Sequence, residues 1–317
     1  MKTLIGLLLA LLASHALAQG YPNKAVRVII SFTPASATDI VGRIVGAKLS
    51  EYWGQPVVAE NRSGAGGSLG SNVVAQAAPD GYTLLINSNA HAVNPAIFAK
   101  LPYDTTKDFT DIAPLAELPN VLVVGADSRF KTLADLINFG KANPGKINFG
   151  HAGVGSGTHL NTVKLITAAD IQVTQVPFKG TPEVVAAIFA GAVDCYWVPV
   201  SAGISNIRAG KLRALAVSTG KRSPLLPDLA TTAESGVNGA DFGLWFGLWG
   251  PAGMPGELVN KISSDTRRAL ADPVVRERLA NTGNTPMDMS PQEFAKFVRS
   301  EIEDYARTAR AAGIKPQ

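Results

Sequence analysis

The feature that most constrains the fold of this chain is a repeated alternation of strand-like and helix-like segments. The apolar runs typical of strands are 26–31, 57–60, 82–86, 121–124, 147–150, 171–176, 193–198, 212–217 and 241–249. The helical patterns between them are 39–52, 71–78, 133–142, 160–168 and a segment that Thr181 opens as N-cap. Such alternation predicts parallel sheets that are covered by helices on both faces.

The end of the chain indicates how these segments divide into lobes. Beyond Pro251 the pattern is helical and contains too few strands for a domain, so we expect this tail to pack on the first series. The chain would then cross between two lobes twice, near 118–121 and 241–250, and form a hinge. We therefore predict an α/β fold with lobe 1 at residues 19–120 and 248–317 and lobe 2 at residues 121–247, each a mainly parallel sheet flanked by helices.

Residues 1–18 read as a leader rather than as part of either lobe. Leu4 to Leu17 is apolar apart from two residues, and Ala16-Leu17-Ala18 matches a signal peptidase site. This pattern predicts a signal peptide that is cleaved after Ala18 and exports the protein to the periplasm.

Composition excludes several classes for the rest of the chain. At 46% hydrophobic and 17% charged residues, the sequence is too apolar for intrinsic disorder. The longest later apolar stretch, 184–193, is far shorter than the ~20 residues of a membrane helix. Lysine and arginine form no cluster, which argues against nucleic-acid binding.

Catalytic and metal signals are weak. Cys195 lies alone in a strand-like run, where a buried thiol is expected. The stretch from Gly66 to Gly70 matches the G-x-S-x-G pattern of a serine hydrolase around Ser68, a short pattern that arises easily by chance. The histidines have no metal-ligand spacing, and no phosphate-binding glycine motif occurs. We expect no enzyme activity, no metal and no cofactor, with a secreted hydrolase using Ser68 as a minor alternative.

Three loops offer helix N-termini, which suit anionic ligands because their backbone N–H groups are free. Loop one (residues 32–39) lies between the first strand and helix, and Ser36 can cap that helix. Loop two (residues 153–159) follows the strand at 147–150, and loop three (residues 64–68) is rich in glycine. Loops one and two hold corresponding positions in the two lobes, so we expect them to form opposite walls of one cleft. Loop three is interpreted as an ordinary turn.

The aromatic run 242–249 is interpreted mainly as core. Because the run coincides with the expected return crossover, one of its faces can border the cleft. Trp245 or Phe246 is then the residue expected to contact a ligand.

Several motifs spread over the chain carry a resemblance to a known family. They include Tyr21-Pro22-Asn23-Lys24, Thr38-Asp39-Ile40-Val41, Ala78-Pro79-Asp80-Gly81-Tyr82-Thr83-Leu84, Gly155-Ser156-Gly157-Thr158-His159-Leu160, Pro177-Phe178-Lys179-Gly180 and Arg222-Ser223-Pro224. Each motif is short, but their number and order make the match specific. The sequence resembles the Bug-type periplasmic receptors, the solute-binding components of tripartite tricarboxylate transporters.

This resemblance implies a two-lobed periplasmic-binding-protein (Venus flytrap) fold that closes on a small organic carboxylate and docks on a membrane permease. It implies a monomer that binds no nucleic acid, and a ligand held mostly by backbone N–H groups of loops one and two. A receptor that senses ligand for a signalling partner is the alternative. The candidate ligand-binding residues are Phe32, Thr33, Pro34, Ala35, Ser36, Ala37, Thr38, Asp39, Ser88, Gly155, Ser156, Gly157, Thr158, His159, Lys179, Trp197, Val198 and Trp245.

The sequence departs from the family pattern at two places. The family's first loop usually has two glycines before Thr-Asp, whereas this chain has Ala35-Ser36-Ala37, so extra Cβ atoms narrow the approach to the backbone. The family often places an aspartate after the strand that ends at Trp197, whereas Val198 stands here. We therefore expect a mono- or dicarboxylate without an amino group, aromatic acids included.

Overall fold

The computed structural model describes residues 20–311, 314 and 316 of the 317-residue chain. The expected signal peptide at residues 1–18 lies outside the described residues. The strands are β1 (Val26–Ile30), β2 (Val57–Asn61), β3 (Thr83–Ser88), β4 (Phe109–Gly125), β5 (Asn148–His151), β6 (Thr174–Pro177), β7 (Cys195–Pro199), β8 (Leu212–Val217), β9 (Gly243–Pro251) and β10 (Thr285–Pro286). The helices are α2 (Ala37–Trp53), the 3-10 turn η2 (Ala65–Gly67), α3 (Ser68–Ala75), α4 (Ala90–Ile97), α5 (Leu133–Ala142), α6 (Gly157–Ala169), α7 (Thr181–Phe189), α8 (Val200–Arg208), α9 (Gly256–Ala271), α10 (Pro273–Asn281) and α11 (Pro291–Ala311).

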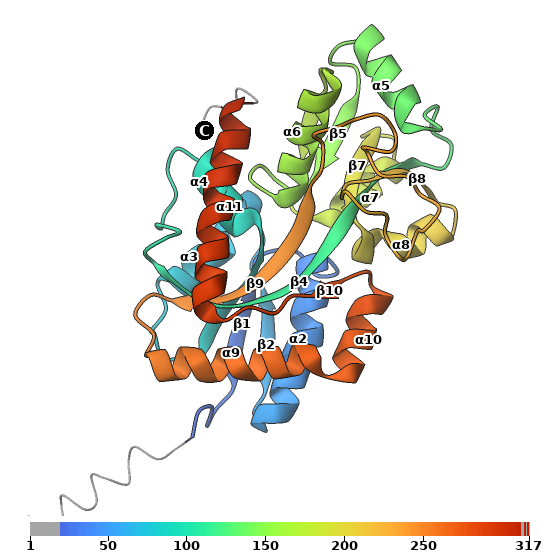
Figure 1. Ribbon diagram of the computed structural model, residues 1–317. Coiled ribbons are helices and arrows are strands. Elements are labelled where there is room, and N and C mark those ends of the chain that lie inside the picture. The colour runs from blue at the N-terminus through green and yellow to red at the C-terminus, as the bar shows by residue number, and fades with distance from the viewer. Residues whose placement is uncertain (1–19, 312–313, 315, 317) are drawn as a thin grey trace, which may run out of the picture.

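The molecule has two lobes, and strand β4 runs through both of them, with β9 paired beside its first part (Figure 1). In one lobe β1 pairs in parallel with β2 and β3, and in the other β5 pairs in parallel with β6 and β7. The described strands β2-β1-β3-β9-β4-β7-β5-β6 form a continuous hydrogen-bonded order. The predicted two-lobed α/β fold is confirmed.

The long strand β4 changes partners where the sequence places the first crossover. Its residues up to Pro119 pair with β9, and those from Asn120 onward pair with β7 and β8. The boundary between the lobes at residues 120 and 121 stays a prediction. The tail after Pro251 returns to the first lobe, because α9 packs on β4 and α2, while α11 packs on α4 and β4.

Two helical layers cover the sheet of the first lobe. On one face, Val41 and Val45 of α2 join Val28 of β1 and Ile262 of α9 in a buried cluster. On the other face, Phe294 of α11 packs among buried apolar residues of α4 and β9. Burying both faces explains why strand β1 and the centre of β3, Leu84 to Ile86, are almost continuously apolar.

Strand β9 shows how the aromatic run divides between these layers. Trp245 and Trp249 lie on the face covered by α11, whereas Leu244, Phe246 and Leu248 lie in the opposite cluster. This is the two-residue alternation of a strand that is buried on both faces. Trp249 also donates its indole N–H to Asp111 Oδ1 (2.8 Å).

The structure differs locally from the sequence expectations. Helices α4 and α8 were not predicted, since both are short, at eight and nine residues, and α4 contains a proline. The N-cap of α7 is Gly180 rather than Thr181, whose hydroxyl is paired with Tyr196 Oη (2.9 Å) instead. Cys195 is buried as expected, and burial raises the pKa of its thiol. None of the described helices combines the length and apolar character of a membrane span.

Candidate ligand-binding site between the lobes

Loop one forms the first wall of the site. Ser36 is the N-cap of α2, and its hydroxyl accepts a hydrogen bond from the amide of Asp39 (3.3 Å). The buried Asp39 carboxylate accepts hydrogen bonds from the amide of Ala35, from Asn61 Nδ2 and from Arg43 Nε, each at 2.9 Å. Asp39 therefore shapes the loop from within and is not free to take a ligand.

Ala35 has an unusual backbone conformation for a residue with a side chain. Its φ is 61°, in the left-handed region that glycine prefers. The amide hydrogen bond to Asp39 holds Ala35 there at a cost of about 1 kcal/mol relative to glycine. The alanine that replaces the family's glycine therefore adds backbone strain as well as a Cβ atom.

Loop two forms the facing wall with the same local design. Ser156 is the N-cap of α6, and its hydroxyl accepts from the amide of His159 (3.2 Å). The hydroxyls of Ser156 and Thr158 lie 3.1 Å apart, and that of Thr158 accepts from the amide of Ala152 (3.0 Å). The amide of Gly155 donates to His159 Nδ1 (3.3 Å). These bonds fix the start of α6 toward the first lobe.

The starts of α2, α6 and α7 converge on one small cavity of about 20 Å³. It is lined by Phe32, Ser36, Ala37, Thr38, Ser88, Ala152, Ser156, Gly157, Thr158, Thr181, Pro199 and Leu244. None of these lining residues carries a charge. The first N–H groups of each helix have no partner in their own helix and, with the helix dipole, favour an anion. The polar groups of the cavity lining are therefore backbone N–H groups and hydroxyls.

The two histidines of the second wall are neutral at pH 7. Burial lowers the pKa of His159 to about 4. Burial, with repulsion from His159, lowers that of His151 to about 3. Their rings lie 4.6 Å apart between centroids. Neither imidazole supplies a positive charge to the cavity, so the helix starts are its only source of positive potential among the lining groups.

The structure places the predicted site residues in different surroundings. The predicted residues that line the cavity are Phe32, Ser36, Ala37, Thr38, Ser88, Ser156, Gly157 and Thr158. Lys179 is exposed, and Trp197 and Val198 lie in the core. Thr33 instead faces Gly180 of the other lobe, while Pro34, Ala35, Asp39, Gly155 and His159 shape the loops around the cavity.

Trp245 lies on the opposite side of β9 from the cavity. Its indole N–H donates to Glu301 Oε2 (2.7 Å) and lies 3.3 Å from Tyr305 Oη, both on α11. The preceding residue, Leu244, lines the cavity instead. Which face of a fully buried strand borders a cleft depends on its pairing with β3 and β4, which the local pattern does not encode.

Sequence reasoning missed four lining residues. Ala152 and Thr181 follow the carboxyl ends of β5 and β6, and Pro199 is the last residue of β7, so all three lie at the edge where α/β sheets bind ligands. Examining the carboxyl end of every strand, and not only the glycine-rich loops, would have identified these three residues. Leu244 carries no such signal.

The hydrolase alternative has no support in the geometry. Ser68 has φ −67° and ψ −29°, an ordinary helical conformation and not a strained nucleophile elbow. Within the described residues, no hydrogen bond joins its hydroxyl to a histidine, and His, Cys, Asp and Glu form no group that could hold a metal ion.

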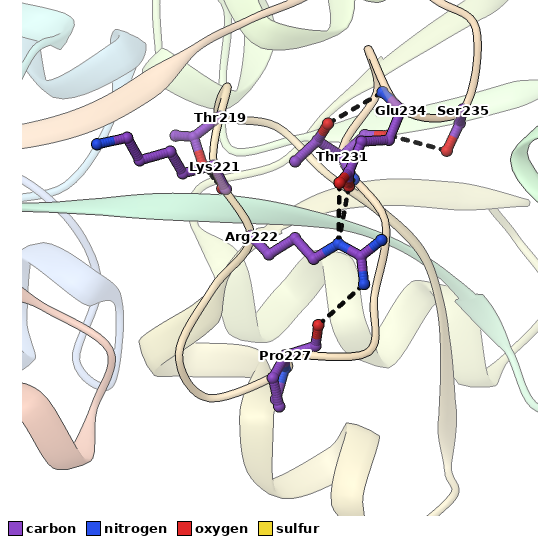
Figure 2. A network of polar contacts seen from close by, with 7 residues as sticks. All are labelled: Thr219, Lys221, Arg222, Pro227, Thr231, Glu234 and Ser235. Atoms are coloured by element: carbon purple, nitrogen blue, oxygen red, sulfur yellow. Dashed lines mark hydrogen bonds and ion pairs between the residues drawn. The ribbon is translucent and has the colours of Figure 1, made fainter.

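The loop between β8 and β9 is held by a network of polar contacts within the second lobe. Arg222 Nε donates to both carboxylate oxygens of Glu234 (2.8 and 3.1 Å), and its Nη1 donates to the carbonyl of Pro227 (3.1 Å). Figure 2 shows Glu234 completing the network with Thr231, whose amide donates to it (2.8 Å). The arginine of the Arg222-Ser223-Pro224 motif thus stabilises this loop and has no contact with the cavity.

Comparison with known proteins agrees with this architecture. Residues 41–314 match the model of the tripartite tricarboxylate transporter family receptor. The chain is 36% identical to the UPF0065 protein in the tcbD-tcbE intergenic region of Pseudomonas sp. (strain P51), over 96% of this chain and 92% of that protein. It is 31% identical to BugT of Bordetella pertussis, over 96% of this chain and 94% of that protein.

Two solved structures from Rhodopseudomonas palustris carry ligands. Rpa4515 with adipate has a TM-score of 0.90 and 32% identity, covering 94% of this chain and 100% of that chain. MatC with bound malate has a TM-score of 0.87 and 33% identity, covering 91% of this chain and 99% of that chain. The described relatives and neighbours are solute-binding proteins and not enzymes.

Proposed function

Because this chain belongs to the tripartite tricarboxylate transporter receptor family, a family of periplasmic solute-binding proteins, we propose that it captures a small organic carboxylate in the cavity between its lobes. The observation that carries the proposal is the convergence of two serine-capped helix starts, those of α2 and α6, on one cavity lined by no charged side chain. Adipate and malate, which two neighbours bind, are carboxylates of this kind.

The proposed ligand is held by hydrogen bonds at both walls. The free N–H groups of Ala37 and Thr38 in one lobe and of Gly157 and Thr158 in the other donate to carboxylate oxygens. A helix N-terminus contributes about 0.3–1 kcal/mol to an anion, and up to about 2 kcal/mol where the site is partly buried. Two such helix starts bind a carboxylate without arginine.

The lining also supports a ligand without an ammonium group. A buried ammonium needs a carboxylate or several acceptor oxygens, and the carboxylate of Asp39 is already occupied by three donors. Val198, which stands where the family often has an aspartate, is buried in the core, and the next residue, Pro199, lines the cavity without a charge. We therefore propose mono- or dicarboxylates, aromatic acids included, and not amino acids.

Binding requires the lobes to separate first. The cavity of about 20 Å³ has room for one water molecule, which needs at least about 10–15 Å³. A four- to six-carbon acid is larger than this cavity, so it enters through an opened hinge at β4 and β9, and the lobes of the bound protein stay further apart than in this structure.

Calorimetric titration with adipate, malate, benzoate and aspartate tests the proposed function. We expect at least one non-amino acid to bind and aspartate to bind at least tenfold more weakly. Thr158→Val should weaken binding about tenfold, because it removes a hydroxyl from the cavity and leaves the amide of Ala152 unpaired. Thr162→Val is the matched control, since its hydroxyl donates to the carbonyl of Thr158 (3.0 Å) outside the cavity. Binding of aspartate alone would overturn the proposal.

We also propose that the protein is a periplasmic monomer that delivers its ligand to permease subunits of a tripartite tricarboxylate transporter. Support for this comes from the family and from the predicted leader. The mass of the exported protein should correspond to cleavage after Ala18, and light scattering should give the monomer mass. Loss of carboxylate uptake on deletion of the permease genes supports transport, whereas unchanged uptake together with a lost transcriptional response supports the sensing alternative.

A further inference from the structure

Loop three contacts the opposite lobe. It forms η2 and the start of α3 in the first lobe, and Gly66 (φ 60°) packs backbone to backbone on loop two. A Cβ atom on Gly66 would lie 2.2 Å from the carbonyl oxygen of Val154, a separation that Cβ atoms do not tolerate. No residue of loop three lines the cavity at the helix starts. The contact is therefore separate from the ligand-binding groups.

Asn94 of α4 completes this contact. It is fully buried, and its carboxamide lies between carbonyl oxygens of the two lobes. In the orientation that satisfies both ends of the amide, Nδ2 donates to Gly155 O (3.1 Å) in the second lobe and to Ala90 O (3.2 Å) in the first. In the opposite orientation it donates to Gly66 O (3.3 Å). A Cβ atom on Gly155 would lie 2.5 Å from this carboxamide.

We propose that Gly66, Asn94, Val154 and Gly155 form an interlobe latch, in which Asn94 and Gly66 act as positioning residues that stabilise the closed arrangement without touching the ligand. Gly66 permits the two backbones to meet, and Asn94 supplies a hydrogen bond across the interface. The inference goes beyond the proposed function, since it assigns part of the closing free energy to contacts outside the cavity.

The latch affects binding through the population of the closed state. The closed arrangement that the latch stabilises has room for one water molecule, so it competes with ligand binding, and the apparent dissociation constant should fall as the closed fraction falls. The ligand must first reach an open cleft, so loss of the latch should accelerate association.

Spin labels on exposed sites of each lobe measure closure directly. Gln76→Cys and Lys141→Cys place one label per lobe, and Cys195 is too buried to react. In the protein without ligand, we expect Asn94→Asp to lower the ratio of closed to open molecules about tenfold, because an aspartate places an acceptor against two carbonyl oxygens. We expect a similar loss for Gly66→Ala.

The matched control is Gly64→Ala in the same loop. Gly64 also has a positive φ (134°), but its added Cβ would meet only Leu69 of its own lobe, at 2.7 Å from Cδ1. Gly64→Ala should therefore strain the loop and leave the distribution of distances between the two spin labels unchanged. Thermal melting monitored by circular dichroism verifies that each variant is folded. If Asn94→Asp does not fold, the comparison of Gly66→Ala with Gly64→Ala tests the latch.

Two results would overturn the latch. One is an unmodified protein that shows only the long separation without ligand, and the other is a Gly66→Ala distribution equal to that of Gly64→Ala. The measurement needs no ligand. If no carboxylate binds but Gly66→Ala opens the lobes, the proposed function fails and the latch stands.

Discussion

In loop one the amide of Ala35 donates to the side chain of Asp39, four residues later. In loop two the amide of Gly155 donates to the side chain of His159, also four residues later. The capping serines have nearly equal backbone angles, with φ −70° and ψ 163° in loop one and φ −71° and ψ 158° in loop two. Each cap amide also donates to the carbonyl three residues earlier, at 3.1 and 3.0 Å. The two lobes therefore present their helix starts through the same hydrogen-bond pattern.

The residues that support this pattern differ in charge and backbone strain. Loop one uses the carboxylate of Asp39, which also takes donors from Asn61 and Arg43. Loop two uses a neutral imidazole and has glycine at the position with positive φ (80° at Gly155). Loop one should therefore depend on a buried polar network, and loop two on pH and on the absence of a Cβ atom.

Removing the network of loop one should have the largest effect. Asp39→Ala leaves the amide of Ala35 without its acceptor and removes one of the two acceptors of Asn61 Nδ2, so we expect it to lower the free energy of unfolding by about 3 kcal/mol. In loop two, His159→Asn retains an acceptor near Gly155 and should cost about 1–2 kcal/mol. Urea unfolding measures both variants. Equal losses of free energy of unfolding in the two variants would show that loop one does not depend more strongly on its polar network than loop two does.

Acidification should test loop two. The pKa of His159 is lowered to about 4 and that of His151 to about 3, both mainly by burial, whereas an unfolded histidine titrates near pH 6.5. The stability from keeping these rings neutral is fully present above pH 6.5 and is lost as pH falls toward 4, because the unfolded chain binds the protons first.

Each buried histidine should lower the free energy of unfolding by about 1.4 kcal/mol per pH unit in this range. His159→Asn removes one titrating ring and should reduce the slope by about that amount. Urea unfolding between pH 7 and 4.5 measures the slope. If the free energy of unfolding fell with pH at the same slope in the variant and in the unmodified protein, burial of His159 would not be a cause of the pH dependence.

Exchanging the residues at the positive-φ position should have the smallest effect. Ala35→Gly relieves the left-handed alanine and should stabilise the protein by about 1 kcal/mol. Ala47→Gly, on the exposed face of α2, is the control and should destabilise by about 1 kcal/mol, as glycine does in a helix. Thermal unfolding distinguishes the two signs. A lower melting temperature for Ala35→Gly would mean that Ala35 is not strained.

Much of this fold could be predicted from local patterns. Helix α5 has the predicted bounds, residues 133–142, because Thr132 and Asp135 form a capping box and an Asn-Pro-Gly stop follows. The cap of α2 by Ser36 was also predicted and is confirmed. These features depend on residues a few positions apart, which the sequence displays directly.

The remaining features depend on tertiary contacts. Loop three reads as a turn because nothing near Gly66 indicates that Val154, far along the chain, lies against it. Leu244 borders the cavity and Trp245 does not because β9 pairs with β3 and β4 in one register. Alternation predicts that two faces exist, but only the assembled sheet decides which one meets the cleft.

Amide NMR of the isotope-labelled protein, titrated with adipate and malate, tests most directly whether both helix starts hold the carboxylate. The account predicts that the amide signals of Ala37, Thr38, Gly157 and Thr158 shift together with one dissociation constant. It also predicts that the indole N–H signal of Trp245, which donates to Glu301 on the opposite side of β9, stays in place. A bound carboxylate that shifts the amides of one loop only, or of neither, would contradict it.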